Sequence, residues 1–186
     1  NHEAVQRLRR RKHRESKPFA VMVATLDDAR AIAAVGPREE EALSERSRPV
    51  VLLRRLPSSR IAEAVAPGLD TIGVMLAYTP LHLLLLMHAR GPLVMTSGNA
   101  SEEPIVSGNA DALERLGEIA DLFLLHDREI ESPVDDSVLR VSGHHRTFIR
   151  RARGYAPLPV AMPFRAPAHI LAVGAHLKST FTLAAD

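Results

Sequence analysis

Short apolar runs alternate with helix-like segments along most of the chain, and this alternation constrains the possible folds most strongly. Turn or polar residues bound the runs, which predict strands over 19–24, 49–55, 71–76, 92–97 and 120–126. The segments between them predict helices over 3–14, 27–35, 38–46, 58–67, 79–89 and 107–117. Two more strand patterns, 136–141 and 147–152, predict a hairpin. This order predicts an α/β fold with a mostly parallel or mixed sheet.

The composition changes after the hairpin. Residues 155–168 contain four prolines and predict an extended linker. The segment that follows, "ILAVGAHLKSTFTLAAD", predicts a strand, a glycine turn and a second strand. Because a lone hairpin cannot bury its faces, we expect 1–154 to be one domain and 169–186 the start of a truncated second domain. The chain also begins on a helix pattern, so we expect it to be an excerpt from a longer protein.

Composition excludes several classes of protein. The chain has 186 residues, of which 46% are hydrophobic, enough to bury the core of one good-sized domain. No apolar run reaches the roughly 18 residues of a membrane span. Cysteine is absent, which excludes a disulfide, a cysteine-rich zinc site and a thiol nucleophile within this sequence. We therefore expect a cytoplasmic protein with no membrane contact.

Basic residues gather at two places. Seven bases and one acid lie between Arg7 and Lys17, and a second group follows the predicted hairpin at Arg146, Arg150, Arg151 and Arg153. Cations at the end of the first helix also favour the helix dipole, so a structural function is an alternative there. Two separate arginine clusters suit an anion such as phosphate, which a guanidinium group binds through paired N–H donors.

Two polar clusters could bind a ligand. Thr96-Ser97-Gly98-Asn99 follows an apolar run that we expect to be a buried strand, and small hydroxyls with backbone N–H groups can surround a phosphate. The same tetrapeptide could be an ordinary turn, and it is not a Walker A loop. Asp135 and Asp136 could hold Mg²⁺, cap a turn or pair with nearby arginines. No histidine pair has the spacing of a metal site.

Together these clusters resemble the YrdC-like domain of the HypF family of hydrogenase maturation carbamoyltransferases. The resemblance covers nearly the whole chain, and the last segment resembles the opening strands of the actin-like domain that follows in that family. The motifs stand in the family's order: "KHRESKPFAVMV", "PVVLL", "APGLDTIGVMLAYTPLHLLL", "LVMTSGNASEEPI", "ADLFLLHDREIESPVDDSVLR" and "IRRARGYAPLPV". The resemblance implies a twisted mixed sheet, flanking helices and a concave basic pocket.

The resemblance also implies a reaction. The full protein takes carbamoyl phosphate and ATP, and an acylphosphatase-like domain releases carbamate. The YrdC-like domain joins carbamate to ATP as carbamoyl-adenylate, with Mg²⁺ bridging the phosphates. The actin-like domain passes the carbamoyl group to the C-terminal cysteine of a partner protein, HypE, for the cyanide ligand of NiFe hydrogenase. Because the carbamate oxygen attacks the α-phosphate, no protein nucleophile is required.

The resemblance assigns functions to particular residues. The basic motif for the triphosphate corresponds to Lys12 and Arg14, and the Ser-x-Asn motif that faces the phosphates corresponds to Ser97 and Asn99. The further residues that it places around the nucleotide are Thr96, Tyr78, His82, Arg140, Arg150 and Arg151. It assigns no metal ligand to the chain.

The sequence departs from the family pattern at several positions. Ala77 replaces a common proline, Leu83 a frequent histidine, and Ala100 and Glu102 replace the usual Leu and Gly. Glu102 would weaken phosphate binding if its carboxylate pointed inward. The opening strand and its Lys-Gly-x-Gly-Gly motif precede Asn1 in the family, so we expect weak or no activity from this excerpt alone.

Two alternative functions remain open at this point. YrdC-like relatives have been connected with double-stranded RNA, whose recognition would need arginines spread over a surface of about 16 base pairs. Convergence of the arginines in one pocket would favour nucleotide chemistry instead. The plainer relatives make threonylcarbamoyl-adenylate for tRNA modification, but they carry Ser-Ala-Asn in place of Ser-Gly-Asn and lack the "RRARGY" segment.

Overall fold

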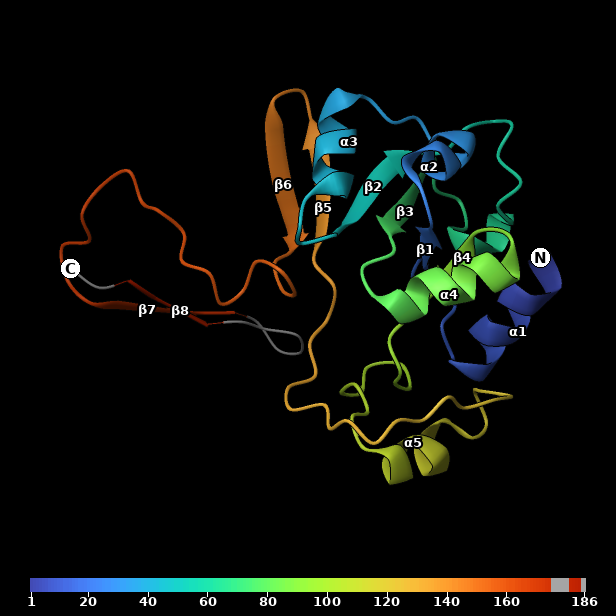
Figure 1. Ribbon diagram of the computed structural model, residues 1–186. Helices are drawn as coiled ribbons and strands as arrows, with labels where there is room; N and C mark the ends of the chain where they lie inside the picture. The colour runs from blue at the N-terminus through green and yellow to red at the C-terminus, as the bar shows by residue number, and fades with distance from the viewer. Residues whose placement is uncertain (175–180, 185–186) are drawn as a thin grey trace.

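A six-stranded mixed sheet forms the centre of the computed structural model, which describes residues 1–174 and 181–184 (Figure 1). The strand order is β4-β1-β3-β2-β5-β6. The strands are β1 (Ala20–Val23), β2 (Val50–Arg54), β3 (Thr71–Leu76), β4 (Leu93–Met95), β5 (Val138–Ser142) and β6 (His145–Arg150). Strand β1 pairs in parallel with β3, as β2 does with β5, and the other three pairs are antiparallel. The predicted mixed α/β sheet and the β5–β6 hairpin are therefore confirmed.

Alternation along the strands separates two faces of the sheet. Val21 and Val23 of β1 point to one face, where they join the main core with buried residues of the first three helices. Met22 points to the other face and packs with Met75 and Leu86 in a smaller cluster. Helices thus cover the central strands on one face, whereas the other face is covered less completely.

Local capping signals fix where the helices begin. Thr25 and Asp28 form a capping box at the start of α2, and the Thr79 hydroxyl accepts from the His82 backbone N–H at the start of α4, which has proline in its first turn. The helices are α1 (His2–Arg11), α2 (Leu26–Ile32), α3 (Pro37–Ser44), the 3₁₀ turn η1 (Glu63–Val65), α4 (Pro80–Ala89) and α5 (Asn109–Leu116).

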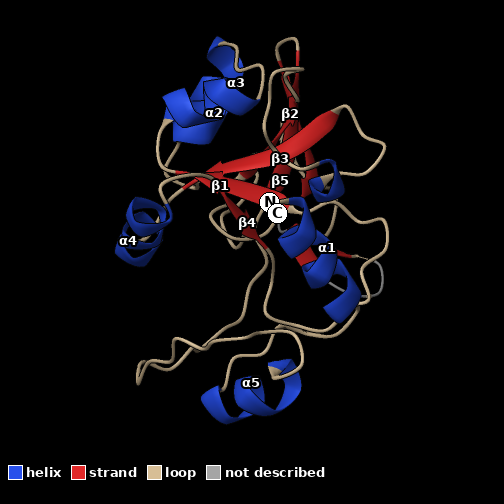
Figure 2. Ribbon diagram, turned by 90° about the vertical axis from the view of Figure 1, so that its right-hand side faces the viewer, coloured by secondary structure: helices blue, strands red, loops and turns tan. Residues whose placement is uncertain are grey.

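Four sequence predictions need correction. Residues 120–126 form no strand, because they pair with no other strand and lie beside α5, away from the sheet (Figures 1 and 2). Leu122 there is 90% exposed. The predicted buried strand at Leu93 is a half-buried edge strand, since only β1 pairs with it. The helix predicted over 58–67 is reduced to the single turn η1. The many charged residues of 38–46 predict an exposed helix, but α3 buries Ala42 and Leu43.

The C-terminal segment forms a separate two-stranded ribbon. Strand β7 (Ile170–Val173) pairs antiparallel with β8 (Phe181–Ala184), which confirms the predicted strand pair. The residues between Gly174 and Phe181, where we placed the rest of the turn, lie outside the described part of the chain. Assignment of this ribbon to an actin-like domain stays a prediction, as do the domain boundaries. Among residues 1–174 and 181–184, every helix is too short or too polar to cross a bilayer.

Candidate functional site

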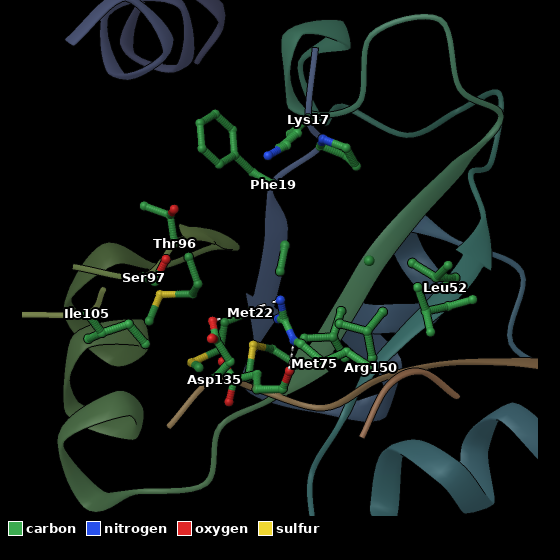
Figure 3. A pocket seen from close by; sticks show the side chains of 18 of the residues that line it. Lys17, Phe19, Met22, Leu52, Met75, Thr96, Ser97, Ile105, Asp135 and Arg150 are labelled. Atoms are coloured by element: carbon green, nitrogen blue, oxygen red, sulfur yellow. Dashed lines mark hydrogen bonds and ion pairs between the residues drawn. The ribbon is translucent and has the colours of Figure 1, made fainter. Parts of the chain in front are cut away.

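A cavity of about 610 Å³ lies on the sparsely covered face of the sheet (Figure 3). Its floor is built from strand residues that share this face: Ala20, Met22, Val50, Leu52, Gly73, Met75, Met95 and Val138. Polar and charged side chains from the loops surround the floor. An apolar floor with a few convergent polar groups is the usual arrangement of a small-molecule site.

Gly73 keeps the middle of this floor open. It pairs with Ala20 on one side and Leu52 on the other, so two of the three adjacent floor positions carry little or no side chain. A Cβ at Gly73 would come within 2.8 Å of Val50 Cγ1. A larger residue would therefore push into the side chains that shape the cavity.

Three cations converge on the cavity. Arg14 and Lys17 reach it from the segment between α1 and β1, and Arg150 reaches it from the end of β6. Burial lowers the pKa of Arg14, and repulsion from Arg9 and Arg150 lowers it further. The charge of Arg150 thus acts on Arg14 within the same site. An anion bound between these guanidinium groups would relieve the repulsion.

The loop after β4 lines the cavity with Thr96 and Ser97 while a buried lysine holds the loop from behind. Thr96 and Ser97 line the cavity. Lys12 is only 2% exposed, and its ammonium donates to the carbonyl oxygens of Ser97 and Asn99, both at 2.7 Å. Neither Lys12 nor Asn99 lines the cavity. The structure therefore places both beneath the loop that faces the cavity, and not against the space where we expected the triphosphate.

Asn99 completes the loop by binding in three directions. Its Oδ1 accepts from Ser97 Oγ at 2.7 Å, its Nδ2 donates to the Glu103 carbonyl at 2.7 Å, and Lys12 Nζ lies 3.4 Å from Oδ1. These contacts fix the tetrapeptide in one conformation. The carboxamide thus acts here as a connector within the loop.

Glu102 forms an ion pair at the rim. Its carboxylate lies 3.2 Å from Lys17 Nζ, and both side chains are largely exposed. Glu102 itself does not line the cavity. Surface pairs of this kind contribute little to stability, so Lys17 can leave Glu102 when an anionic ligand competes for the ammonium.

The two carboxylates at the start of β5 face arginines. Asp136 Oδ1 accepts from Arg153 Nε at 2.7 Å, and Asp135 Oδ1 lies 3.8 Å from Arg150. Within the described residues, no group of three or more acidic or histidine side chains could hold a metal ion. Of the three alternatives for these aspartates, pairing with arginine is the one that the structure favours.

Tyr78 forms part of the cavity wall together with two neighbours behind it. The guanidinium of Arg153 lies 3.7 Å from the centre of the Tyr78 ring, and His82 meets the same ring edge-on at 4.5 Å. Burial raises the pKa of the Tyr78 phenol, and the charge of Asp136 raises it further, so the hydroxyl keeps its proton at neutral pH. Burial lowers the pKa of His82, whose Nδ1 has no partner among the described residues.

The neutral state of His82 predicts a pH dependence of stability. The pKa of His82 in the folded chain lies below that in the unfolded chain, about 6.5, so the unfolded state binds the proton more readily. The stabilisation is complete above about pH 6.5 and is lost as the pH falls through the folded value. Urea unfolding at about pH 7 and about pH 5 should show a loss of stability that His82→Gln reduces. An equal loss in both proteins would contradict this.

Two further predicted site residues, Arg140 and Arg151, lie outside the cavity, as do Lys12, Asn99 and His82. Arg140 shares a sheet face with the floor residue Val138, but it is two positions further along β5 and exposed. Arg151 follows the end of β6, and its guanidinium donates to the carbonyls of Tyr155 and Leu158. Of the three arginines predicted to line the cavity from this region, only Arg150 does so.

The model of the Sua5, YciO and YrdC family, described as "Telomere recombination", matches residues 1–152. The chain therefore belongs to this family of α/β proteins. It is 47% identical over 182 residues to "Carbamoyltransferase HypF" of Synechocystis sp., with 98% of this chain and 24% of the relative covered. It is 46% identical over 185 residues to "Carbamoyltransferase HypF" of Rhodobacter capsulatus, again with 98% and 24% covered. The chain spans about a quarter of the length of these curated relatives. The resemblance to HypF carbamoyltransferases is therefore confirmed, and the similarity is to a YrdC-like part of them.

Solved structures agree with this placement. A structure described as "full-length HypF in the phosphate- and nucleotide-bound form" superposes with a TM-score of 0.92 at 47% identity, covering all of this chain and 29% of that one. Sua5 of P. abyssi complexed with L-threonine superposes with a TM-score of 0.70 at 20% identity, covering 82% of this chain and 45% of that one. The second likeness concerns the fold alone.

Proposed function

We propose that this chain is the nucleotide-activating part of a HypF-type carbamoyltransferase, in which ATP and carbamate react to form carbamoyl-adenylate and pyrophosphate. One observation carries the proposal: Arg14, Lys17 and Arg150 line a single cavity together with Thr96 and Ser97. The nucleotide-bound state described for a 47% identical HypF supports the choice of ATP. Transfer of the carbamoyl group to HypE would require the parts of the relatives that this chain does not span.

The proposed reaction places negative charge where the cavity has cations. Attack of the carbamate oxygen on the α-phosphorus breaks the bond to the β-phosphate bridging oxygen, and pyrophosphate carries the electron pair away. Fixed cations and hydrogen-bond donors that face this leaving group lower the barrier. In the proposed complex Arg14, Lys17 and Thr96 would face this leaving group, and Ser97, whose hydroxyl donates to Asn99, would hold the loop beside it. The chain stabilises the charge of the leaving group and orients the substrates, and all the reacting atoms belong to the substrates.

Magnesium would enter this site together with ATP. Mg²⁺ usually keeps several waters and binds substrate phosphates with few protein ligands. Asp135 and Asp136 face Arg150 and Arg153, so they do not form a separate carboxylate cage. In the proposed complex the ion would neutralise phosphate charge, and the chain's arginines would bind the remaining phosphate oxygens.

Removal of Arg14 should weaken ATP binding. A charged hydrogen bond contributes about 1.5–3 kcal/mol, so Arg14→Ala should raise the Kd for ATP roughly 10- to 100-fold. Calorimetric titration measures this directly. Arg10→Ala is the matched control, because Arg10 is an exposed arginine of α1 that does not line the cavity. Equal ATP affinity in the Arg14 and Arg10 variants would exclude Arg14 from the site.

Exchange of labelled pyrophosphate into ATP tests the reaction itself. We define the extended protein as this chain preceded by the opening strand and Lys-Gly-x-Gly-Gly motif of the HypF family. Exchange should depend on carbamate, supplied as ammonium carbamate, and threonine with bicarbonate should not support it. Exchange driven by threonine and bicarbonate alone would assign the chain to threonylcarbamoyl-adenylate synthesis and overturn the proposal.

A further inference from the structure

Arg153 is held more completely than any cation that lines the cavity, although it does not line the cavity itself. Its Nε donates to Asp136 Oδ1 at 2.7 Å, and its two terminal nitrogens donate to the carbonyls of Ser47 and Arg48 at 3.0 and 2.9 Å. Its backbone N–H donates to the Asp135 carbonyl at 3.0 Å. The guanidinium plane is thereby fixed from several directions.

The guanidinium group of Arg153 stacks on the ring of Tyr78, a residue that lines the cavity. Its central carbon lies 3.7 Å from the centre of the Tyr78 ring. His82 contacts that ring edge-on from another side, and the remaining surface of Tyr78 faces the cavity. Tyr78 is 37% exposed and belongs to the loop between β3 and α4, so no strand ladder holds it. Its orientation therefore depends on these side-chain contacts.

We propose that Arg153 is a positioning residue that holds Tyr78 as a wall of the cavity, so that Arg153 contributes to ligand affinity only through Tyr78. The inference rests on the proposed function for the identity of the ligand, ATP. Lysine cannot replace arginine here, because an ammonium group has neither the flat face that stacks on the ring nor the fork that binds Asp136 and two carbonyls together. Loss of the stack should let the Tyr78 ring turn toward solvent.

The orientation of Tyr78 can be followed without any ligand. The chain has two tyrosines and no tryptophan, so Tyr155→Phe leaves Tyr78 as the only phenol. The Tyr155 hydroxyl has no hydrogen-bond partner among the described residues, so this background change removes no such contact. Ultraviolet absorption then records the ionisation of Tyr78 alone. The charges that face this phenol are Asp136 and Arg153, and neutral His82 packs against its ring.

In this background, Arg153→Lys keeps a positive charge where the charge of Arg153 lowers the pKa of Tyr78. A ring that turns into water loses both the burial and the Asp136 contact that raise this pKa, so the Tyr78 titration should shift down toward the ordinary value of about 10. Arg146→Lys is the matched control, since Arg146 lies on β6 and pairs with Glu41 and Glu45. An unchanged titration in Arg153→Lys would overturn the positioning inference. A downward shift of equal size in the Arg146 variant would also overturn it.

A double-mutant cycle on the extended protein tests the link to ligand binding. Arg153→Lys should raise the Kd for ATP about tenfold when Tyr78 is present, and it should cause no further loss in Tyr78→Leu. Additive losses would show that Arg153 acts independently of Tyr78 and would overturn the inference. If the unmodified extended protein fails to bind ATP, the proposed function fails with the ligand part of the inference, while the phenol titration still decides the positioning part.

Discussion

Replacement of Lys12 by methionine is expected to abolish ATP binding, although Lys12 does not line the cavity. The substitution removes the ammonium that holds the Ser97 and Asn99 carbonyls and leaves these acceptors buried. The hydroxyls of Thr96 and Ser97 would then lose their fixed direction. Because buried acceptors without donors are costly, we also expect the free energy of unfolding to fall by about 3 kcal/mol. Calorimetry with ATP and urea unfolding measure the two effects.

Lys17→Met is the comparison that identifies how Lys12 acts. Lys17 lines the cavity and is largely exposed, so its loss should weaken ATP binding while leaving the stability nearly unchanged. Lys12→Met should lose both ATP binding and stability. If Lys12→Met loses ATP binding with full stability, Lys12 contacts the triphosphate directly, as the family resemblance implies, and its function in shaping the loop is refuted.

Gly154→Ala is expected to lower the free energy of unfolding by about 3 kcal/mol. Gly154 has φ +85°, and a Cβ there would lie 2.6 Å from Ser47 Cβ and 2.8 Å from Ser47 Cα. Both atoms belong to the segment whose carbonyls bind Arg153, so the clash would also separate Arg153 from its partners. The measurement is equilibrium unfolding in urea.

Gly143→Ala separates backbone strain from the clash. Gly143 also has positive φ, at +58°, but a Cβ added there would meet no heavy atom within 4 Å beyond its chain neighbours. Only the cost of a left-handed alanine, about 1–2 kcal/mol, should appear there. Equal losses at the two glycines would mean that the contact with Ser47 contributes nothing.

The short apolar runs along the sequence made much of the fold predictable. Strands β1 to β4 lie within the segments whose apolar pattern predicted them, and β5 and β6 overlap the two segments predicted as a hairpin. The helix predicted over 79–89 is α4, which Thr79 caps and Pro80 begins. The run at 120–126 failed because apolar content alone does not provide a pairing partner. The cavity floor was also predictable in principle, since Ala20 and Met22 alternate with core residues of β1.

The candidate site was harder to predict than the fold. The two basic clusters and the loop after β4 do meet at one cavity, through Arg14, Arg150 and Ser97. Sequence reasoning could not show that Lys12 would be buried beneath the loop, because burial depends on contacts 85 residues apart. It also gave no sign that Arg153 would stack on Tyr78, since stacking depends on the relative placement of two loops.

The most direct test compares the affinities of the extended protein for ATP, for AMP and for a duplex RNA of about 16 base pairs. Calorimetric titration should show saturable binding of ATP with magnesium, much weaker binding of AMP, and no binding of the duplex. The difference between ATP and AMP should depend on Arg14, because the proposed complex places the outer phosphates against that residue. Equal affinity for ATP and AMP, or duplex binding that falls steeply with salt in the absence of ATP binding, would contradict the central claim.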